Sequence, residues 1–487
     1  MIIRKTVSRS EVIMRIVGRL KEKKELNSIV NSGKPEFVVV YGRRRVGKTY
    51  LVREYFEQSF SFHFTGYANA TKNEQLIGFN NALNRYGKKE YPLAKSWLVA
   101  FQQLIDLLEN ADVDEKTGRK VVFLDEMPWM DTPKSRFLIG LEHFWNSWAD
   151  GKKELVLIVC GSATTWLTKK VFLNTGGLYN RITRRLYLQP FSLKECEEYF
   201  SFLGMILNRH QMLESYMVFG GIPFYLKMMD TSLSLHQNID RLCFDKEAPL
   251  KQEFGILYSS LFKNPEWYIA VVEALEKCNK GMTREEIINT LGIASSGSLT
   301  QVLAGLEQSN FIRGYEGYNK IKKDVIWQLS DPFSLFYLKH MRQKSRSTKG
   351  HWASFAGSGA YNAWSGYAFE QVCLSHIEQI RKALGISGIH TLISSWKSHT
   401  QESGAQIDLV IDRSDHTINL CEMKYSIHEF EISKAYAETL KTKRFAFAAE
   451  TKTRKALHQT LVTVNGVKKN IHSADIQSVI TAEDLFE

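Results

Sequence analysis

A glycine-bordered segment at residues 42–49, GRRRVGKT, carries the first spacing that can do chemistry. Two glycines let such a loop curl until its backbone N–H groups point inward at phosphate oxygens. Lys48 would then reach the β- and γ-phosphates of a nucleotide, and the Thr49 hydroxyl would ligate Mg²⁺. An apolar run at 37–41 precedes the loop and a helix expected at 49–58 follows it, so the helix N-terminus adds to the anion site. The sequence therefore predicts a site for ATP and Mg²⁺.

A second candidate group follows the apolar run at 121–124, which ends in two carboxylates. Asp125 would hold Mg²⁺ through its water shell, and Glu126 would polarise the attacking water. A third apolar run, 155–160, leads to Ser162, which we expect to sense the γ-phosphate or orient water. Gly-Ser at a strand end is also ordinary turn chemistry, so that alternative stays open.

Arginines form the third candidate group. Three of them lie near a turn at 180–185, and we favour Arg181 as the one that stabilises charge on the transferred phosphoryl group, from the same subunit or a neighbour. A solvated basic turn is the alternative, and the loop arginines are equally suited to a partner surface. The residues predicted to bind or act on the nucleotide are Gly42, Arg43, Arg44, Arg45, Val46, Gly47, Lys48, Thr49, Tyr50, Asp125, Glu126, Ser162 and Arg181.

Near the end of the chain, strands expected at 405–412 and 417–424 flank a turn and predict a hairpin. The first carries Asp408. On the second, Glu422 and Lys424 are two residues apart and so share a face. An Asp beside a Glu-x-Lys can gather a metal ion, with the lysine steadying a nucleophile or a departing charge. The alternative to a metal site is a hairpin that carries these charged side chains on its surface.

The apolar runs alternate with amphipathic segments as far as about residue 190, which predicts an α/β fold with a parallel sheet. The pattern then turns helical. Three helical segments and a hairpin between 263 and 335 follow the order of a winged helix-turn-helix, whose Thr283 and Glu286 predict a capping box. The wing is its basic part, through Arg313, Lys320, Lys322 and Lys323. Contact with DNA and packing within the chain both fit this module.

Several motifs together resemble the AAA+-related, archaeal-type ATPases that border the STAND class. They are Gly18-Arg19 with Glu22 and Leu26, GRRRVGKT, LDEMPW, CGSATTW, LYNRITRR and GGIPFYL at 220–226. The resemblance covers about 15–335. It implies that the Gly-Gly-x-Pro segment belongs to a helical lid, and that the lid and winged helix report nucleotide state.

Residues 360–487 resemble the PD-(D/E)XK, restriction-endonuclease-like fold and the domain of unknown function found after this type of ATPase. Asp408, Glu422 and Lys424 match its core motif, and Glu370 matches the acidic residue of its first helix, so the resemblance implies a metal site of Glu370, Asp408 and Glu422. The expected domains are an ATPase core (1–190), a helical lid (191–262), a winged helix (263–335), a basic linker (336–358) and an α/β nuclease-like domain (359–487).

The chain has 487 residues with 64 Lys and Arg against 52 Asp and Glu, a net charge of +12, which favours nucleic acid as a partner. Six scattered cysteines without a C-x-x-C pair argue against a zinc site or a disulfide scaffold and fit the cytoplasm. The charged N-terminus argues against a signal peptide. The chain has no run of 18 apolar residues, which excludes a membrane-spanning helix.

Two functions fit these features. The first is a regulatory ATPase coupled to a metal-dependent, nuclease-like domain that binds DNA. The alternative is a STAND-like nucleotide switch, alone or as a homo-oligomer, whose C-terminal domain binds DNA or a protein partner without cleaving. A ring translocase is disfavoured because the lid segment at 220–226 offers no sensor arginine or lysine.

Overall fold

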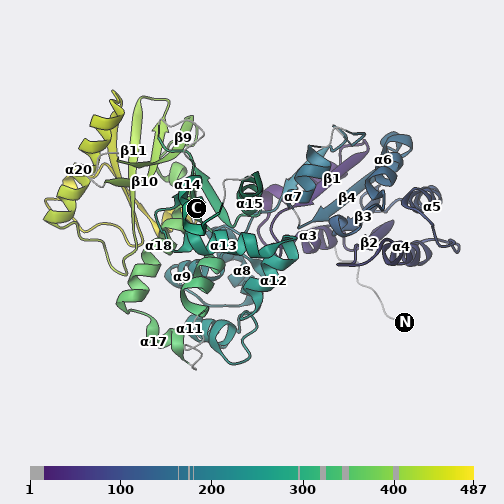
Figure 1. Ribbon diagram of the computed structural model, residues 1–487, viewed down its shortest axis with the longest axis horizontal. Helices are drawn as coiled ribbons and strands as arrows, with labels where there is room; N and C mark the ends of the chain where they lie inside the picture. Colours follow the sequence, from purple (N-terminus) through teal and green to yellow (C-terminus); the bar gives the residue numbers. More distant parts are fainter. Residues whose placement is uncertain are drawn as a thin grey trace. The chain divides into compact units, whose positions relative to one another are not determined.

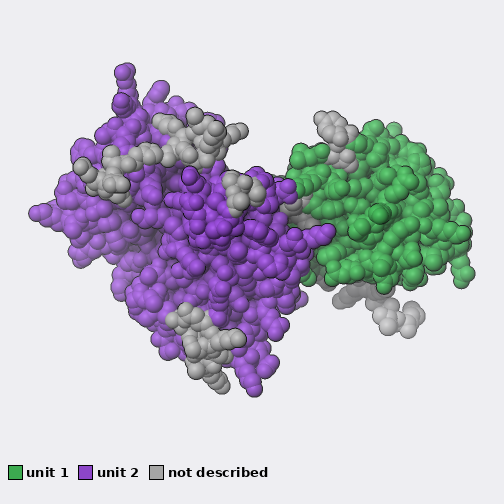
Figure 2. Space-filling view, viewed as in Figure 1, with its two compact units in different colours: residues 1–190 green, residues 191–487 purple. Residues whose placement is uncertain are grey.

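The computed structural model describes residues 16–162, 164–173, 176–178, 180–293, 297–318, 325–342, 350–398 and 405–487. It forms two compact units, residues 1–190 and 191–487 (Figure 2). The predicted wing lysines Lys320, Lys322 and Lys323, and residues 343–349 of the predicted linker, lie outside the described residues.

The first unit is built on a five-stranded parallel sheet in the order β2-β3-β4-β1-β5 (Figure 1). Its strands are β1 Glu36–Tyr41, β2 Phe62–Thr65, β3 Lys120–Asp125, β4 Leu155–Gly161 and β5 Arg184–Tyr187. The apolar runs predicted from the sequence became β1, β3 and β4, which are buried along nearly their whole length, as central parallel strands are. Strands β2 and β5 escaped prediction because each has four residues and few fully buried positions.

Helices surround this sheet: α2 Leu20–Val30, α3 Lys48–Tyr55, α4 Lys72–Tyr86, α5 Trp97–Glu109, α6 Phe137–Ser147 and α7 Thr164–Leu167. Helix α2 begins directly after Arg19, which is left-handed with φ 55°. The helix expected to end at residue 58 ends at Tyr55, because Glu57 and Gln58 also have positive φ.

The second unit opens with helices α8 Leu193–Leu203, α9 Arg209–Phe219, α10 Pro223–Lys227, α11 Leu235–Ile239 and α12 Glu253–Leu261. The helical pattern expected after residue 190 is broken between α9 and α10, where Gly220 has φ 61° and Pro223 opens the new helix. Across the described ranges, no helix combines the length and apolar character that crossing a bilayer requires.

Three helices and a small sheet follow. The helices are α13 Pro265–Glu276, α14 Arg284–Leu291 and α15 Gly297–Gln308, and the sheet has the order β6-β8-β7, with β6 Met282–Thr283, β7 Ile312–Tyr315 and β8 Ile326–Leu329. The predicted capping box of Thr283 and Glu286 is confirmed at the start of α14. Just beyond β7, Tyr318 N donates to Ser395 O at 3.0 Å, which joins this part to the next sheet.

The last sheet has the order β13-β12-β11-β10-β9. Its strands are β9 Thr391–Lys397, β10 Gln406–Arg413, β11 Thr417–Lys424, β12 Ala456–Thr463 and β13 Ser478–Thr481. The predicted antiparallel hairpin is confirmed as β10 and β11, and β12 and β13 add on in parallel. The accompanying helices are α16 Pro332–Phe336, α17 His351–Phe355, α18 Gly359–Ser375, α19 Ile377–Ala383, α20 Lys434–Thr451 and α21 Ala482–Leu485.

Helices α18 and α19 meet at His376, which ends the first and begins the second. The ring of His376 is buried, and its Nε2 accepts a hydrogen bond from Leu193 N at 3.0 Å. A ring held by a distant backbone group fixes the chain at this residue, which explains the break.

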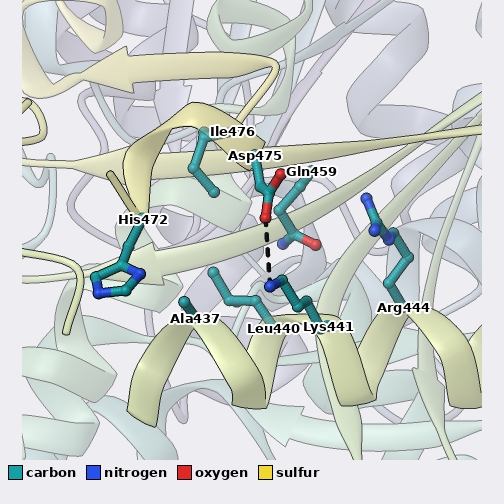
Figure 3. A pocket seen from close by; sticks show the side chains of 8 residues that line it. All are labelled: Ala437, Leu440, Lys441, Arg444, Gln459, His472, Asp475 and Ile476. Carbon is teal, nitrogen blue, oxygen red and sulfur yellow. Dashed lines mark ion pairs between the residues drawn. The ribbon is translucent and has the colours of Figure 1, made fainter. Parts of the chain in front are cut away.

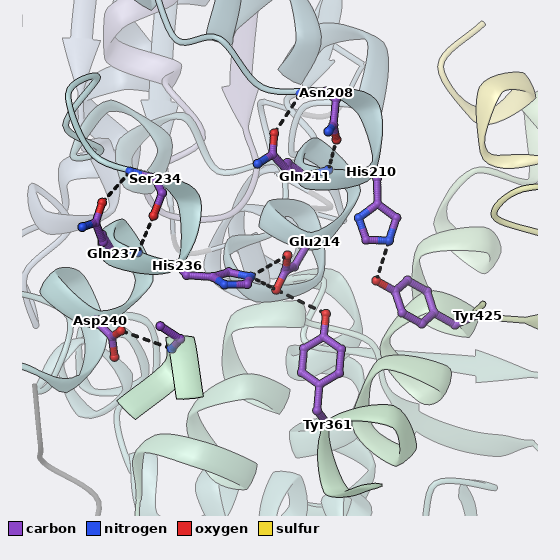
Figure 4. Close-up of polar contacts among 11 residues, drawn as sticks. Asn208, His210, Gln211, Glu214, Ser234, His236, Gln237, Asp240, Tyr361 and Tyr425 are labelled. Atoms are coloured by element: carbon purple, nitrogen blue, oxygen red, sulfur yellow. Dashed lines mark hydrogen bonds and ion pairs between the residues drawn. The ribbon is translucent and has the colours of Figure 1, made fainter. Parts of the chain in front are cut away.

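Helix α9 is joined to the last domain by buried polar contacts (Figure 4). Glu214 of α9 is buried, and Tyr361 of α18 donates to its carboxylate at 3.2 Å. His236 Nε2 lies 3.1 Å from both oxygens of the same carboxylate, and this bond raises the pKa of His236. His210, one turn earlier on α9, lies 3.2 Å from the hydroxyl of Tyr425, which follows β11. We call these five side chains the α9 joint.

Candidate functional site

The loop between β1 and α3 has the backbone shape that the glycine spacing predicted. Gly42 has φ 142°, and a Cβ there would lie 2.2 Å from Leu188 O, so only glycine fits. Gly47 has φ 94° and Arg45 φ 71°, which turn the chain back on itself before α3 begins at Lys48. Left-handed residues that alternate with right-handed ones let a loop aim several N–H groups at one anion.

Lys48 is buried inside this loop. Its ammonium donates to the carbonyls of Gly42 at 3.0 Å and Arg43 at 2.9 Å. Burial lowers the pKa of Lys48, and the nearby Asp125 and Glu126 oppose that shift. The loop carbonyls therefore hold the ammonium of Lys48, the lysine that the sequence analysis predicted to bind phosphate.

The predicted magnesium ligands lie next to each other at the carboxyl edge of the sheet. Thr49 Oγ1 donates to Asp125 Oδ1 at 3.0 Å, although the two residues are 76 positions apart. Asp125 is buried at the end of β3, and its Oδ1 also accepts from Glu126 N at 3.0 Å. The structure thus brings together the hydroxyl and the carboxylate that the sequence assigned to one ion.

Glu126 and Ser162 also meet. Ser162 Oγ lies 3.2 Å from Glu126 Oε2, and Ser162 N donates to the same oxygen at 3.4 Å. Glu126 itself is left-handed, with φ 48°, so its side chain leaves β3 in a direction set by a turn. The residue predicted to activate water is therefore held by the residue predicted to sense the γ-phosphate.

The arginines are more dispersed. Arg43 is buried, Arg44 and Arg45 are partly exposed, and Tyr50 is half exposed. Arg181 pairs with Asp150 at 3.4 Å on the surface, with both side chains about half exposed. Among the described residues, the structure records no contact of Arg181 with Lys48, Asp125 or Glu126. Its role in stabilising charge on the transferred phosphoryl group therefore stays a prediction.

Arg19 was named in a sequence motif but given no role there. Its buried guanidinium donates to Val46 O of the loop at 2.9 Å and to Gln189 O at 2.7 Å. The Gly18-Arg19 motif was the available signal in the sequence, and only the fold reveals the partners of Arg19. Arg19 braces the phosphate loop from behind.

We expect Arg19→Ala to weaken ATP binding about tenfold, because two charge-assisted hydrogen bonds to backbone carbonyls are lost. Calorimetric titration of ATP would measure the change. Lys21→Ala, an exposed lysine on α2, is the matched control and should bind like the parent. Equal ATP affinity in the Arg19→Ala protein would contradict the bracing role.

A second group of charged residues lies on the last sheet. Asp408 and Glu422 are on adjacent antiparallel strands, where Leu409 pairs with Cys421. Glu422 is buried, whereas Asp408 of β10 and Glu370 of α18 are partly buried. Residues from three elements thus face one region.

The pKa values of these carboxylates are raised. Burial, with the charges of Asp408 and Glu422, raises the pKa of Glu370 well above its usual range. Burial and the charge of Asp408 raise the pKa of Glu422 to about 7. Burial raises the pKa of Asp408, and Lys443 and Lys424 oppose that shift. The three acids therefore repel one another in a desolvated site.

Within the described ranges, no group of three or more His, Cys, Asp or Glu side chains is arranged to hold a metal ion. Instead, Lys443 of α20 donates to both oxygens of Glu422, at 2.7 and 2.8 Å. Lys424 lies over the ring of Tyr436, 5.1 Å from its centroid. The sequence reasoning missed Lys443, which is one of several lysines on a helix and carries no motif.

Comparison with known proteins bears on the first site. Residues 16–229 match the family described as an ATPase domain predominantly from Archaea. This segment is an archaeal-type ATPase domain. Within the ATPase domain lie the loop at 42–49, Asp125, Glu126, Ser162 and Arg181, and a domain of this type binds nucleotide.

Two further similarities extend beyond the ATPase domain. An uncharacterized protein of Methanocaldococcus jannaschii is 25% identical over 427 residues, which cover 87% of this chain and 90% of that protein. The structure of a Walker-type ATPase of Pyrococcus abyssi is similar with a TM-score of 0.51 and 20% identity, over 67% of this chain and 97% of that one. The second similarity supports the α/β fold with a parallel sheet.

Proposed function

We propose that this protein is an ATP-hydrolysing regulatory ATPase coupled to a metal-dependent, nuclease-like domain that binds DNA. In the ATPase domain, Thr49 and Asp125 would hold Mg²⁺, since their oxygens, 3.0 Å apart, are the kind of ligand this ion takes. Bound there, the ion would neutralise charge on the β- and γ-phosphates. Lys48 binds the same phosphates, and the loop amides orient them.

Glu126 is the proposed general base. It must accept a proton from the attacking water, and its carboxylate is held by hydrogen bonds from Ser162 at 3.2 and 3.4 Å. We propose that Ser162 positions Glu126 and that Arg181 stabilises the phosphoryl group, from its exposed turn or from a neighbouring subunit.

The nuclease proposal rests on one observation: Asp408 and Glu422 lie on paired strands, their charges raise the pKa of Glu370 on α18, and the charge of Lys424 acts on all three acids. Repelling carboxylates in a desolvated site are stabilised by a cation. The carboxylate oxygens of Asp408 and Glu422 are hard ligands of the kind that Mg²⁺ takes. A bound ion would polarise a phosphodiester and lower the pKa of its water. Lys424 would steady the attacking or departing oxygen.

Basic groups near these acids support a polyanionic substrate. The positive charge of Lys280 opposes the rise in the pKa of Asp408, and that of Arg313 on β7 opposes the rise in the pKa of Glu370. Both belong to residues 263–335, where α13, α14, α15 and the three-stranded sheet support our proposal of a winged helix. We retain the domain limits 1–190, 191–262, 263–335, 336–358 and 359–487.

We expect the parent protein to nick plasmid DNA with Mg²⁺ or Mn²⁺, and Lys424→Ala to reduce nicking by about 100-fold or more, because charge on the departing oxygen loses its stabiliser. Gel assays with and without ATP would measure it. Lys468→Ala, an exposed lysine paired with Glu431, is the control and should nick normally. Nicking that persists in Lys424→Ala would exclude this site. DNA binding without any nicking by the parent would favour the non-cleaving STAND-like alternative.

A further inference from the structure

Helix α20 contributes two polar side chains to the carboxylate cluster. Tyr436 and Lys443 are seven residues apart, which places them on the same face of the helix, two turns from each other. The next residue on this face, Phe447, is fully buried and packs against Trp396 of β9. The packing of Phe447 therefore fixes the rotation of α20 and directs this face at the sheet.

Lys443 and Glu422 form the closest contact of the cluster. The ammonium lies 2.7 Å from one oxygen of Glu422 and 2.8 Å from the other. The Glu422 side chain is 2% exposed and that of Lys443 is 20% exposed. A carboxylate removed from water needs a counter-ion, and Lys443 fills that need with both oxygens occupied.

The two lysines of the cluster have different surroundings. Lys424, which belongs to the predicted motif, lies over the Tyr436 ring. Lys443 contacts the carboxylate directly. An ion that takes Glu422 as a ligand must displace Lys443 from at least one oxygen, because a carboxylate oxygen cannot face an ammonium and a divalent cation at the same close distance.

We propose that Lys443 is the counter-ion of Glu422 in the metal-free protein, and that a divalent cation at Asp408 and Glu422 displaces it so that its ammonium binds a DNA phosphate. The inference rests on the proposed nuclease-like site and adds a residue that the motif does not contain. Lys443 has a partly exposed side chain on a long flexible stem, so its ammonium can change partners without moving α20. Metal binding and DNA binding are then linked through one side chain.

The first test is calorimetric titration of the full chain with Mn²⁺ at pH 8.5, without DNA or nucleotide. Lys443→Met keeps the stem and removes the competing charge, so we expect Mn²⁺ to bind on the order of tenfold more tightly than to the parent. Lys443→Arg keeps the charge and pairs with carboxylates through two donors, so it should bind Mn²⁺ no more tightly than the parent. Glu422→Gln should lose this site, and its titration gives the background from the phosphate loop.

Lys441→Met is the matched control. Lys441 is on the same helix as Lys443 but on a different face. It lines a shallow depression and pairs with Asp475 at 3.7 Å (Figure 3). Lys441→Met should leave the affinity for Mn²⁺ unchanged. Unchanged or weaker Mn²⁺ binding by a folded Lys443→Met protein would overturn the inference, and so would tighter binding by Lys443→Arg, which stays informative if Lys443→Met does not fold.

The second test measures binding of a short fluorescent duplex in Ca²⁺. Lys443→Met should bind the duplex several-fold more weakly even though it binds Mn²⁺ more tightly, because a phosphate contact is lost. A purely structural role would weaken both. Unchanged duplex affinity would overturn the phosphate contact. If the parent and Glu422→Gln titrate identically with Mn²⁺, the proposed metal site itself is wrong, which distinguishes that failure from the failure of this inference.

Discussion

Lys48→Ala is expected to bind ATP at least about 100-fold more weakly than the parent protein, because the β- and γ-phosphates lose their buried cationic partner. In the structure that ammonium is already inside the loop, 3.0 Å from Gly42 O and 2.9 Å from Arg43 O. Calorimetric titration with ATP and Mg²⁺ would measure the loss.

Lys24→Ala, an exposed lysine on α2, should bind ATP normally and serves as the control. Thermal unfolding should show that Lys48→Ala remains folded, since removing a buried cation also removes its desolvation cost. A folded Lys48→Ala protein with parental ATP affinity would refute the phosphate site.

Glu126→Gln should keep ATP affinity and slow hydrolysis by about 10²- to 10⁴-fold, because an amide cannot take the proton of the attacking water. The change is nearly isosteric, and the amide can still meet Ser162. Release of inorganic phosphate under saturating ATP, together with calorimetric affinity, would separate the two effects.

The matched control is Glu115→Gln, which changes an exposed acid of the same unit. Hydrolysis at the parental rate by Glu126→Gln would show that another group serves as the base. Loss of ATP affinity instead would mean that Glu126 acts mainly on the ion or the loop.

The phosphate loop was predictable because its chemistry is local. Gly42, Gly47, Lys48 and Thr49 lie within one stretch of chain, and the strand before them and the helix after them are strong local patterns. Asp125 was predictable for a second reason: parallel strands present their carboxyl ends at one edge, so an acid at the end of an apolar run must lie near the loop.

Contacts that depend on the fold were not predictable. Arg19 reaches Val46, and Lys443 reaches Glu422, across 27 and 21 residues, and neither spacing has a meaning in sequence alone. The four-residue strands β2 and β5 owe their existence to longer neighbours that supply their hydrogen bonds. The division at His376 required Leu193, 183 residues away.

The α9 joint has a consequence for how such proteins can be cut and recombined. Helix α9 lies inside the range 16–229 that matches the ATPase family, yet its Glu214 is bonded to His236 and Tyr361, and its His210 to Tyr425, which all follow that range. Cutting the chain at residue 229 would remove His236, Tyr361 and Tyr425, three of the five side chains of the α9 joint. A chimera that takes its C-terminal part from a relative would therefore need a tyrosine at both positions to keep these contacts with α9.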